Sequence, residues 1–245
     1  MSEAIYSLRG VNLVKRYKST QILHGVSIEV KSAQVVGLLG PNGAGKTTTF
    51  YIICGLVDAT SGEVWLNDKE IGSLRLFERA HAGISYLPQE ASIFKDLTVE
   101  ENLLMAAELA YSKDRQEQHR RVEALLEQFS IEHIRARKGI NLSGGERRRA
   151  EIARALVSEP KFILLDEPFA GVDPIAVADI QKMITTLTRQ NIGVLITDHN
   201  VRETLSICDH AYVLHEGAIM ASGSAKEIGA NRKVRAHYLG ESFRL

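Results

Sequence analysis

The sequence has few of the features that mark secreted, membrane-spanning or nucleic-acid-wrapping proteins. Its 245 residues include only two cysteines, which cannot build a disulfide framework or a zinc cluster. Its apolar runs, such as residues 35–39 and 162–165, are far shorter than the roughly 20 residues that cross a bilayer. Positive and negative side chains balance at 30 each, so there is no cationic surplus for neutralising nucleic-acid phosphates. We therefore expect a cytoplasmic protein without a nucleic-acid partner, which reaches a membrane only through another subunit.

What the sequence does contain is an alternation of strand-like and helix-like segments. This alternation predicts an α/β fold with a parallel sheet. The helical stretch from Thr98, which opens with a capping box that ends at Glu101, predicts a separate subdomain. We expect strands at 5–13, 22–30, 35–39, 63–66, 84–87, 162–165 and 192–197, and helices after Gly45, at 75–81, 98–129 and 143–158, from Pro174, and once beyond Gly223.

The segment Gly40–Thr47, GPNGAGKT, lies between a buried strand and a helix and fits the pattern of a phosphate-binding loop. Its glycines let successive backbone N–H groups turn inward toward phosphate oxygens. In such a loop Lys46 reaches the β and γ phosphates, the Thr47 hydroxyl faces Mg²⁺, and Thr48 adds a donor near the α phosphate. The structural alternative is a glycine-rich turn into a helix. The residues expected to contact a nucleotide here are Asn42, Gly43, Ala44, Gly45, Lys46, Thr47 and Thr48.

Two adjacent carboxylates, Asp166 and Glu167, follow the apolar run 162–165. Open α/β sheets bind their ligands at the carboxyl ends of the strands, so catalytic groups are expected here. Asp166 can hold a metal ion through water, whereas Glu167 points elsewhere and can polarise a water for attack on the γ phosphate. The alternative is a solvated acidic turn, which the presence of a phosphate loop in the same chain disfavours.

A third motif, LSGGE at residues 142–146, has both a structural and a functional interpretation. Ser143 and Glu146 form the pattern of a capping box, which satisfies helix-end donors without any ligand. The serine hydroxyl and the glycine N–H groups at a helix N-terminus also make an anion site. The two interpretations are compatible, because the same geometry that caps a helix can bind a γ phosphate.

The phosphate loop, the LSGGE motif and the LLDEP segment at 164–168 together resemble the ATP-binding cassette family over nearly the whole chain. The resemblance implies an ATPase with a RecA-like P-loop NTPase core. This core and an antiparallel β subdomain would together comprise residues 1–89 and 160–245, and a small α-helical subdomain would comprise residues 90–159. It also implies a head-to-tail homodimer. ATP and Mg²⁺ would bind between the phosphate loop of one copy and Ser143, Gly144 and Gly145 of the other.

The same resemblance assigns roles to residues that also have structural explanations. Tyr17 would stack on adenine, or it is an ordinary surface tyrosine. Gln89 would contact the metal ion and the attacking water, or it is a solvated turn residue. Asp173 would lie at the dimer seam, but it is also an expected N-cap before Pro174. His199 would contact the γ phosphate, with a non-functional histidine as the alternative.

Only 53 residues separate Gln89 from Ser143, which leaves no room for the long coiled coil of chromosome-handling cassette proteins. A subunit of a transporter fits better. The segments at 88–94 and 97–103 and the closing Phe243–Leu245 resemble the ATPases of lipopolysaccharide export. Branched-chain amino-acid importer ATPases share part of this pattern and are the alternative. A soluble, nucleic-acid-associated cassette scaffold is the alternative from a different class.

Resemblance to the export ATPases implies a homodimer beneath two transmembrane subunits, on the cytoplasmic face of the bacterial inner membrane. Phe94 is then the candidate anchor for these membrane subunits, because aromatic side chains often fill pockets at the centre of an interface. The alternative is an ordinary core phenylalanine. The tail from Glu241 to Leu245 either braces the dimer or frays.

Overall fold

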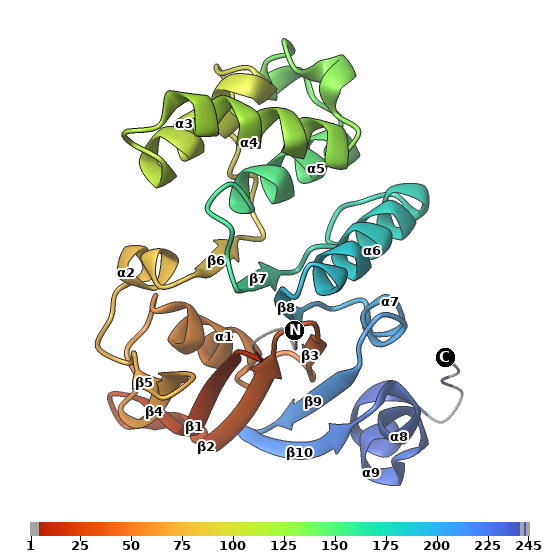
Figure 1. Cartoon of the computed structure of the whole chain (residues 1–245). Coiled ribbons are helices and arrows are strands. Elements are labelled where there is room, and N and C mark those ends of the chain that lie inside the picture. The colour runs from red at the N-terminus through yellow and green to blue at the C-terminus, as the bar shows by residue number, and fades with distance from the viewer. Residues whose placement is uncertain (1–4, 241–242, 244–245) are drawn as a thin grey trace.

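The computed structural model describes residues 5–240 and 243 of the chain (Figure 1). A long hairpin opens the fold and belongs to an antiparallel sheet with the strand order β2-β1-β4-β5. The turn between the first two strands is Lys18–Ser19, and Lys18 has a φ of 52°, as tight hairpin turns require. The strands of this sheet are β1 (Ser7–Tyr17), β2 (Thr20–Lys31), β4 (Ser61–Leu66) and β5 (Lys69–Glu70).

The larger sheet has the order β10-β9-β3-β8-β7-β6 and is parallel except for its edge strand β10. Its central strands are buried along their whole length, as expected for a parallel sheet that is covered on both faces. In β7, Ile163 and Leu165 join one hydrophobic cluster while Phe162 and Leu164 join another. The strands are β3 (Val35–Leu39), β6 (Ile84–Leu87), β7 (Phe162–Asp166), β8 (Gly193–Thr197), β9 (His210–His215) and β10 (Ala218–Gly223).

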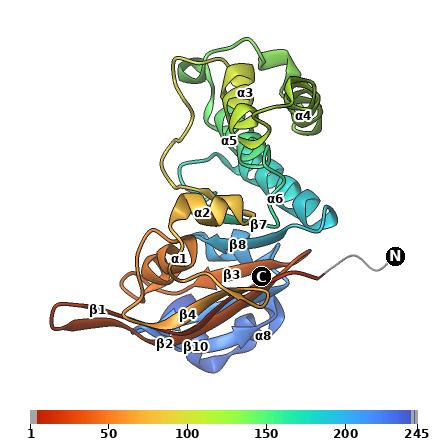
Figure 2. The ribbon, with the colours of Figure 1, turned by 60° about the vertical axis from the view of Figure 1, so that its left-hand side comes forward.

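Helices cover both faces of this sheet, and a helical part stands above it (Figures 1 and 2). The helical part consists of α3 (Val99–Ala110), α4 (Arg115–Gln128), α5 (Gly144–Ala155) and the short 3₁₀ turns Glu132–Ile134 and Gly139–Asn141. Beside the sheets lie α1 (Lys46–Cys54), α2 (Leu76–His81), α6 (Pro174–Arg189) and α7 (Val201–Leu205). The C-terminal part comprises α8 (Ala225–Ala230), α9 (Arg232–Val234) and a π-helical turn at Arg235–Leu239.

The expected α/β fold class is confirmed, and so is the capping box of α3, in which Thr98 and Glu101 bond each other's backbone N–H groups. Several details of the prediction are wrong. The helical stretch 98–129 divides into α3 and α4, because Asp114 caps a new helix. The tail contains more than one helix, and the sequence pattern gave no sign of β9 and β10. No helix within residues 5–240 has the length and apolar character needed to cross a bilayer.

Candidate functional site

The phosphate loop connects β3 to α1 and is held in a tight turn by its glycines. Gly45 has a φ of 98°, and a Cβ at this position would collide with the side chain of Leu23. The ammonium group of Lys46 lies inside the loop, where it donates to the carbonyl oxygens of Gly40 at 2.6 Å and Pro41 at 3.0 Å. Burial lowers the pKa of Lys46, and the negative charge of Glu167 opposes this shift.

The outer rim of the loop is open to solvent. Asn42, Gly43 and Thr47 are exposed, Thr48 is half-buried, and Ala44 is buried. From behind, the turn between β9 and β10 supports the loop, because the N–H of Gly217 donates to the carbonyl of Ala44 at 3.1 Å. The loop therefore presents its backbone donors and the first turn of α1 to a ligand, and the C-terminal hairpin fixes its position.

Gln89, Glu167 and His199 meet beyond the carboxyl ends of β6, β7 and β8. One carboxylate oxygen of Glu167 accepts a hydrogen bond from the Gln89 amide at 2.7 Å, and the other lies 2.7 Å from Nε2 of His199. The Glu167 N–H donates to the carbonyl of Thr197 at 2.7 Å. Glu167 has a φ of 45°, a left-handed conformation that non-glycine residues adopt only where their surroundings enforce it. Residues far apart in the sequence thus form one polar cluster.

Asp166 precedes this cluster at the end of β7 and is only 4% exposed. Burial raises the pKa of its carboxyl group, and the adjacent charge of Glu167 adds to the shift. A nearby cation would lower the pKa of Asp166 again, because it stabilises the ionised carboxylate.

Two buried charged residues of the site were missed at the sequence level. Asp198, which is 1% exposed, accepts hydrogen bonds from the N–H groups of Phe169 at 2.9 Å and Asn200 at 2.7 Å. It thereby fixes the backbone on both sides of the Glu167–His199 pair. Its position directly after a buried strand and before His199 was the only signal.

Arg148 is the second missed residue, and it joins α5 to the ends of β6 and β7. Its guanidinium lies 3.3 Å from Glu151 and donates to the carbonyls of Pro88 at 3.1 Å and Asp166 at 3.5 Å. Glu151 in turn accepts from the N–H groups of Ser92 and Ile93. Burial lowers the pKa of Arg148. The charge is nevertheless retained, because guanidinium groups do not deprotonate in proteins.

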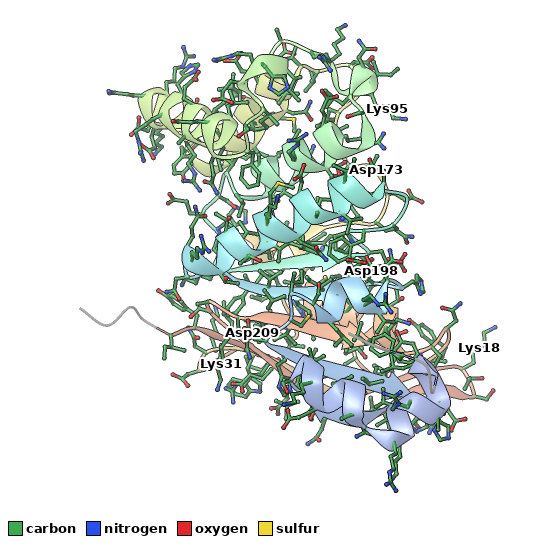
Figure 3. All side chains as sticks on the ribbon, turned by 90° about the vertical axis from the view of Figure 1, so that its right-hand side faces the viewer. Lys18, Lys31, Lys95, Asp173, Asp198 and Asp209 are labelled. Carbon is green, nitrogen blue, oxygen red and sulfur yellow. The ribbon has the colours of Figure 1, made fainter. Side chains whose placement is uncertain are left out.

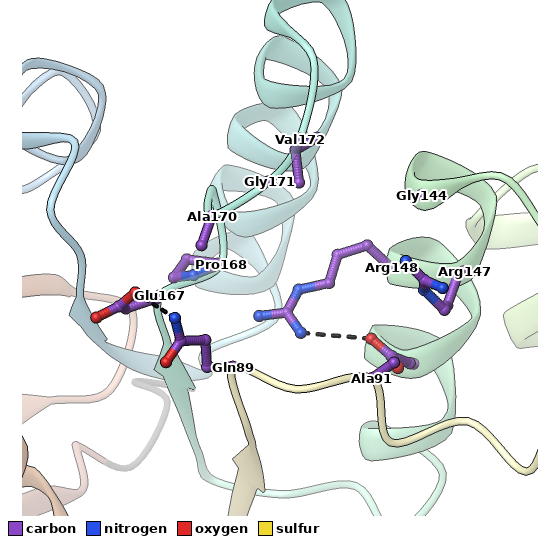
Figure 4. A pocket seen from close by; sticks show the side chains of 11 residues that line it. Gln89, Ala91, Gly144, Arg147, Arg148, Glu167, Pro168, Ala170, Gly171 and Val172 are labelled. Atoms are coloured by element: carbon purple, nitrogen blue, oxygen red, sulfur yellow. Dashed lines mark hydrogen bonds and ion pairs between the residues drawn. The ribbon is translucent and has the colours of Figure 1, made fainter.

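A small cavity of about 60 Å³ lies between α5 and the catalytic cluster (Figure 4). Figure 4 shows Gln89 and Glu167 on one side of it and Arg147, Arg148 and Gly144 on the side of α5. The phosphate loop does not line this cavity. The cavity therefore lies between α5 and the catalytic end of the sheet, and it is distinct from the phosphate-binding surface.

The serine-glycine turn of residues 143–145 begins α5, in the helical part and away from α1 (Figure 1). Ser143 caps the helix as predicted: its hydroxyl accepts from the N–H of Glu146 at 3.3 Å, and the Glu146 carboxylate accepts from the N–H of Ser143 at 2.9 Å. Ser143 and Gly144 are exposed. Within residues 5–240, no hydrogen bond joins this turn to the phosphate loop.

The remaining predicted residues lie at the surface. Asp173 is an N-cap, since its carboxylate accepts from the N–H groups of Ile175 and Ala176, both at 3.0 Å. Tyr17 is 49% exposed at the hairpin tip, with the Lys15 ammonium 4.9 Å from its ring centroid. In Figure 3, Asp173, Asp198 and Lys18 of the hairpin turn all lie toward one side of the molecule, and Asp209 and Lys31 lie toward the other.

Phe94 is 49% exposed, and its loop is held rigidly. The guanidinium carbon of Arg154 lies 5.3 Å from the Phe94 ring centroid. The fully buried Asn102 accepts from the N–H of Phe94 at 2.9 Å and donates to its carbonyl at 3.1 Å. The ring is therefore presented to solvent from a fixed backbone. The tail from residue 241 to 245 was expected either to brace the dimer or to fray, and all of it except Phe243 lies outside the described residues.

Comparison with known proteins agrees with this geometry. The profile of a family described as "ABC transporter" matches residues 23–170. The lipopolysaccharide export system ATP-binding protein LptB of Haemophilus influenzae is 53% identical over 238 residues, which cover 97% of this chain and 99% of that protein. The solved ADP conformation of the ATP-binding cassette MJ1267 is 34% identical, with a TM-score of 0.85 over 96% of this chain and 99% of that one.

The ATP-binding cassette MJ0796 has been solved as a dimer, in a post-hydrolysis state bound to ADP and Pi. It is 25% identical to this chain, with a TM-score of 0.77 over 89% of this chain and 98% of that one. The profile match, the sequence identity to relatives, and the phosphate loop with its polar cluster all indicate the same family. This chain therefore belongs to the ATP-binding cassette (ABC) transporter family and is an ATP-binding ATPase subunit of such a transporter.

Proposed function

We propose that two copies of this chain hydrolyse ATP at composite sites and thereby drive lipopolysaccharide export from the inner membrane. One observation carries the composite site: the phosphate loop that precedes α1 and the serine-glycine turn of residues 143–145 that begins α5 belong to different parts of the molecule. A head-to-tail second copy would supply the missing half. The dimeric state described for the related cassette MJ0796 supports this arrangement.

In this proposal the phosphate loop binds the ATP phosphates through its backbone N–H groups and Lys46. The ammonium of Lys46, which now donates to two loop carbonyls, would exchange them for β- and γ-phosphate oxygens. Thr48 adds a donor from the first turn of α1. Tyr17 offers one exposed ring face to adenine while Lys15 covers part of the other. The partner's serine-glycine turn closes over the γ phosphate, with Asp173 at the seam.

The donor set near the phosphate loop fits Mg²⁺. Thr47, Gln89 and Asp166 carry hydroxyl, amide and carboxylate oxygens, which are the ligands that this hard cation prefers. When bound, the ion would neutralise charge on the β and γ phosphates. Thr47, Gln89 and Asp166 would hold the ion, and its charge would favour the ionised form of the buried Asp166 carboxylate, whose pKa is raised by burial.

Glu167 is proposed to orient and polarise the water that attacks the γ phosphate. Gln89 and His199 each bond one of its carboxylate oxygens, so the three side chains form a preorganised group. His199 is 53% exposed at its side chain and can contact the γ phosphate from the same position. Hydrolysis would then open the dimer and move the attached membrane subunits.

The transported substrate is inferred from the relatives. The LptB protein of Haemophilus influenzae matches nearly the whole chain at 53% identity, and its name assigns it to lipopolysaccharide export. We infer a homodimer on the cytoplasmic face of the inner membrane, with residues 1–89 and 160–245 as nucleotide-binding core and 90–159 as helical subdomain. Phe94 would anchor two transmembrane subunits, because it combines exposure with a rigid loop.

Size exclusion of a Glu167→Gln variant tests the composite site. The variant keeps every phosphate ligand but has lost its polarising carboxylate, so ATP and Mg²⁺ should convert it from monomer to dimer. A Lys46→Ala, Glu167→Gln double variant is the control and should stay monomeric under the same conditions. A Glu167→Gln protein that binds ATP and remains strictly monomeric would contradict the proposal.

A further inference from the structure

Two histidines that take no part in the proposed ATPase lie side by side in the C-terminal part of the chain. His215 is the last residue of β9, and His237 lies in the π-helical turn Arg235–Leu239. Their ring centroids are 5.4 Å apart, and the ring planes are inclined at 71° to each other. His237 is exposed and His215 is half-buried, so an ion from solution can reach the pair.

Packing beneath the pair holds the two segments together. The buried side chains of Val213 in β9 and Val234 in α9 belong to one hydrophobic cluster, and Tyr238 packs against it. Figure 1 shows the C-terminal helices beside β9 and β10. The backbone on both sides of the contact is therefore anchored in the interior, and the two imidazoles meet at its surface.

The separation of the rings is the one that a shared metal ion requires. Zinc–nitrogen bonds are about 2.1 Å long, and each coordinating nitrogen lies about 1.1 Å from its ring centre. At a tetrahedral angle, two such rings have their centroids about 5.3 Å apart. The 5.4 Å between the centroids of His215 and His237 agrees with this value. Because the χ2 torsion of histidine is broad, small rotations can aim one nitrogen of each ring at a common point.

A hydrogen bond fixes which nitrogen of His237 carries the lone pair. Nδ1 of His237 lies 2.9 Å from the carbonyl oxygen of Lys233, one helical turn earlier. A carbonyl oxygen can only accept, so Nδ1 carries the proton of the neutral ring and Nε2 carries the lone pair. Metal-binding histidines commonly hold their other nitrogen against a carbonyl or a carboxylate in this way. The ring of His237 is thus already in the tautomer that a metal ion needs.

We propose that His215 and His237 bind one divalent transition-metal ion of the zinc class. Imidazole nitrogen suits Zn²⁺, Ni²⁺ and Cu²⁺, whereas Mg²⁺ prefers oxygen ligands, so this site is separate from the proposed Mg²⁺ site. Among the residues that the structure describes, no third histidine, cysteine or carboxylate joins the pair, so water completes the coordination. The N–H of Gly217, two residues after His215, holds the carbonyl of Ala44 in the phosphate loop. The ion would therefore tie the C-terminal turn to the hairpin that supports this loop.

Calorimetric titration of the full-length, tag-free protein with Zn²⁺ tests the site. Wild type should bind one ion more than His237→Phe, which keeps an aromatic ring beside His215 but cannot ligate a metal. His215→Phe should lose the same ion, and the double variant should lose no further one, because both histidines act on one ion. His81→Ala is the matched control and should bind like wild type. His81 is also exposed, and its Nδ1 lies 2.8 Å from the carbonyl oxygen of Phe77.

Two results would overturn the proposal. If wild type and His237→Phe bind the same number of Zn²⁺ ions, the two rings only pack against each other. If His237→Phe loses an ion that His215→Phe retains, the two histidines do not share it. Zinc that binds elsewhere, for example beside Glu167, remains in every variant and cancels in the comparison. Either result would leave the proposed ATPase site untouched.

The melting temperature gives a second measurement of the same site. A ligand that binds only the folded protein stabilises it, so Zn²⁺ should raise the melting temperature of wild type more than that of His237→Phe. The shift of wild type should disappear when EDTA is added. An equal shift in the two proteins would contradict a site at His237.

Discussion

The imidazole Nε2 of His199 lies 2.7 Å from Oε1 of Glu167. This contact joins His199, two residues beyond the end of β8, to Glu167, the residue after β7, across neighbouring parallel strands. It holds the Glu167 carboxylate in place before any substrate arrives. A preorganised group of this kind loses no free energy to reorientation during the reaction.

Replacing His199 by alanine should therefore lower the turnover number for ATP hydrolysis about 100-fold, the lower range for loss of a positioned catalytic group. The apparent affinity for ATP should change little, because the phosphate loop is intact. Phosphate release at saturating ATP measures the effect. The control is His210→Ala, which alters a histidine on β9 that contacts Tyr212. Full activity of His199→Ala would remove His199 from the mechanism.

Truncating Phe94 should separate partner binding from catalysis. Because the ring is half exposed, Phe94→Ala should leave the melting temperature and the ATPase activity of the isolated protein unchanged. Affinity copurification from membranes should lose the transmembrane subunits. Leu109→Ala, which removes an 80% exposed side chain from α3, is the control for a nonspecific effect. If Phe94→Ala unfolds the isolated protein, the core interpretation is correct.

Removing Arg148 should destabilise the chain, because it leaves the carboxylate of Glu151 buried without its cation. Both side chains are at most 6% exposed, and breaking such a pair costs about 3 kcal/mol of unfolding free energy. Urea denaturation of Arg148→Ala measures this loss. Arg120→Ala breaks an exposed ion pair with Glu117 and should have no measurable effect. Equal stability of the two variants would show that the buried pair is dispensable.

The sequence predicted best the elements and caps that depend only on residues close together in the chain. The buried run at 35–39 followed by glycines predicted the strand, loop and helix at the phosphate site, and S-x-x-E predicted the cap at Ser143. These patterns are local, since the hydrophobic period and the capping donors lie within one element.

The sequence could not predict the contacts that depend on the order of strands in the sheet. The contacts of Glu167 with Gln89 and His199 exist because β6, β7 and β8 are adjacent, which no local pattern encodes. Strand β9 was missed because its short sequence, HAYVLH, begins and ends with histidine and lacks a clear turn signal before it.

The cap of α5 predicts a pH dependence that a single substitution can isolate. Hydrogen bonding from the Ser143 N–H, helped by the Ser143 hydroxyl and Arg137, lowers the pKa of Glu146. Because the folded-state pKa is the lower one, the carboxylate contributes its full stabilisation above the unfolded value of about 4.3. This contribution is lost as the pH falls through the lowered folded-state pKa.

Glu146→Gln keeps the acceptor of the capping box but removes its charge from the helix N-terminus. At pH 7 the variant should be about 0.5 kcal/mol less stable than wild type, and this difference should shrink progressively below pH 4.3. Urea midpoints measured from pH 7 to pH 3.5 would show the convergence. Glu108→Gln makes the same change at an exposed position of α3 and controls for the loss of net charge. A difference between wild type and Glu146→Gln that stays constant over this range would mean that the ionised carboxylate adds nothing to the cap beyond its role as an acceptor.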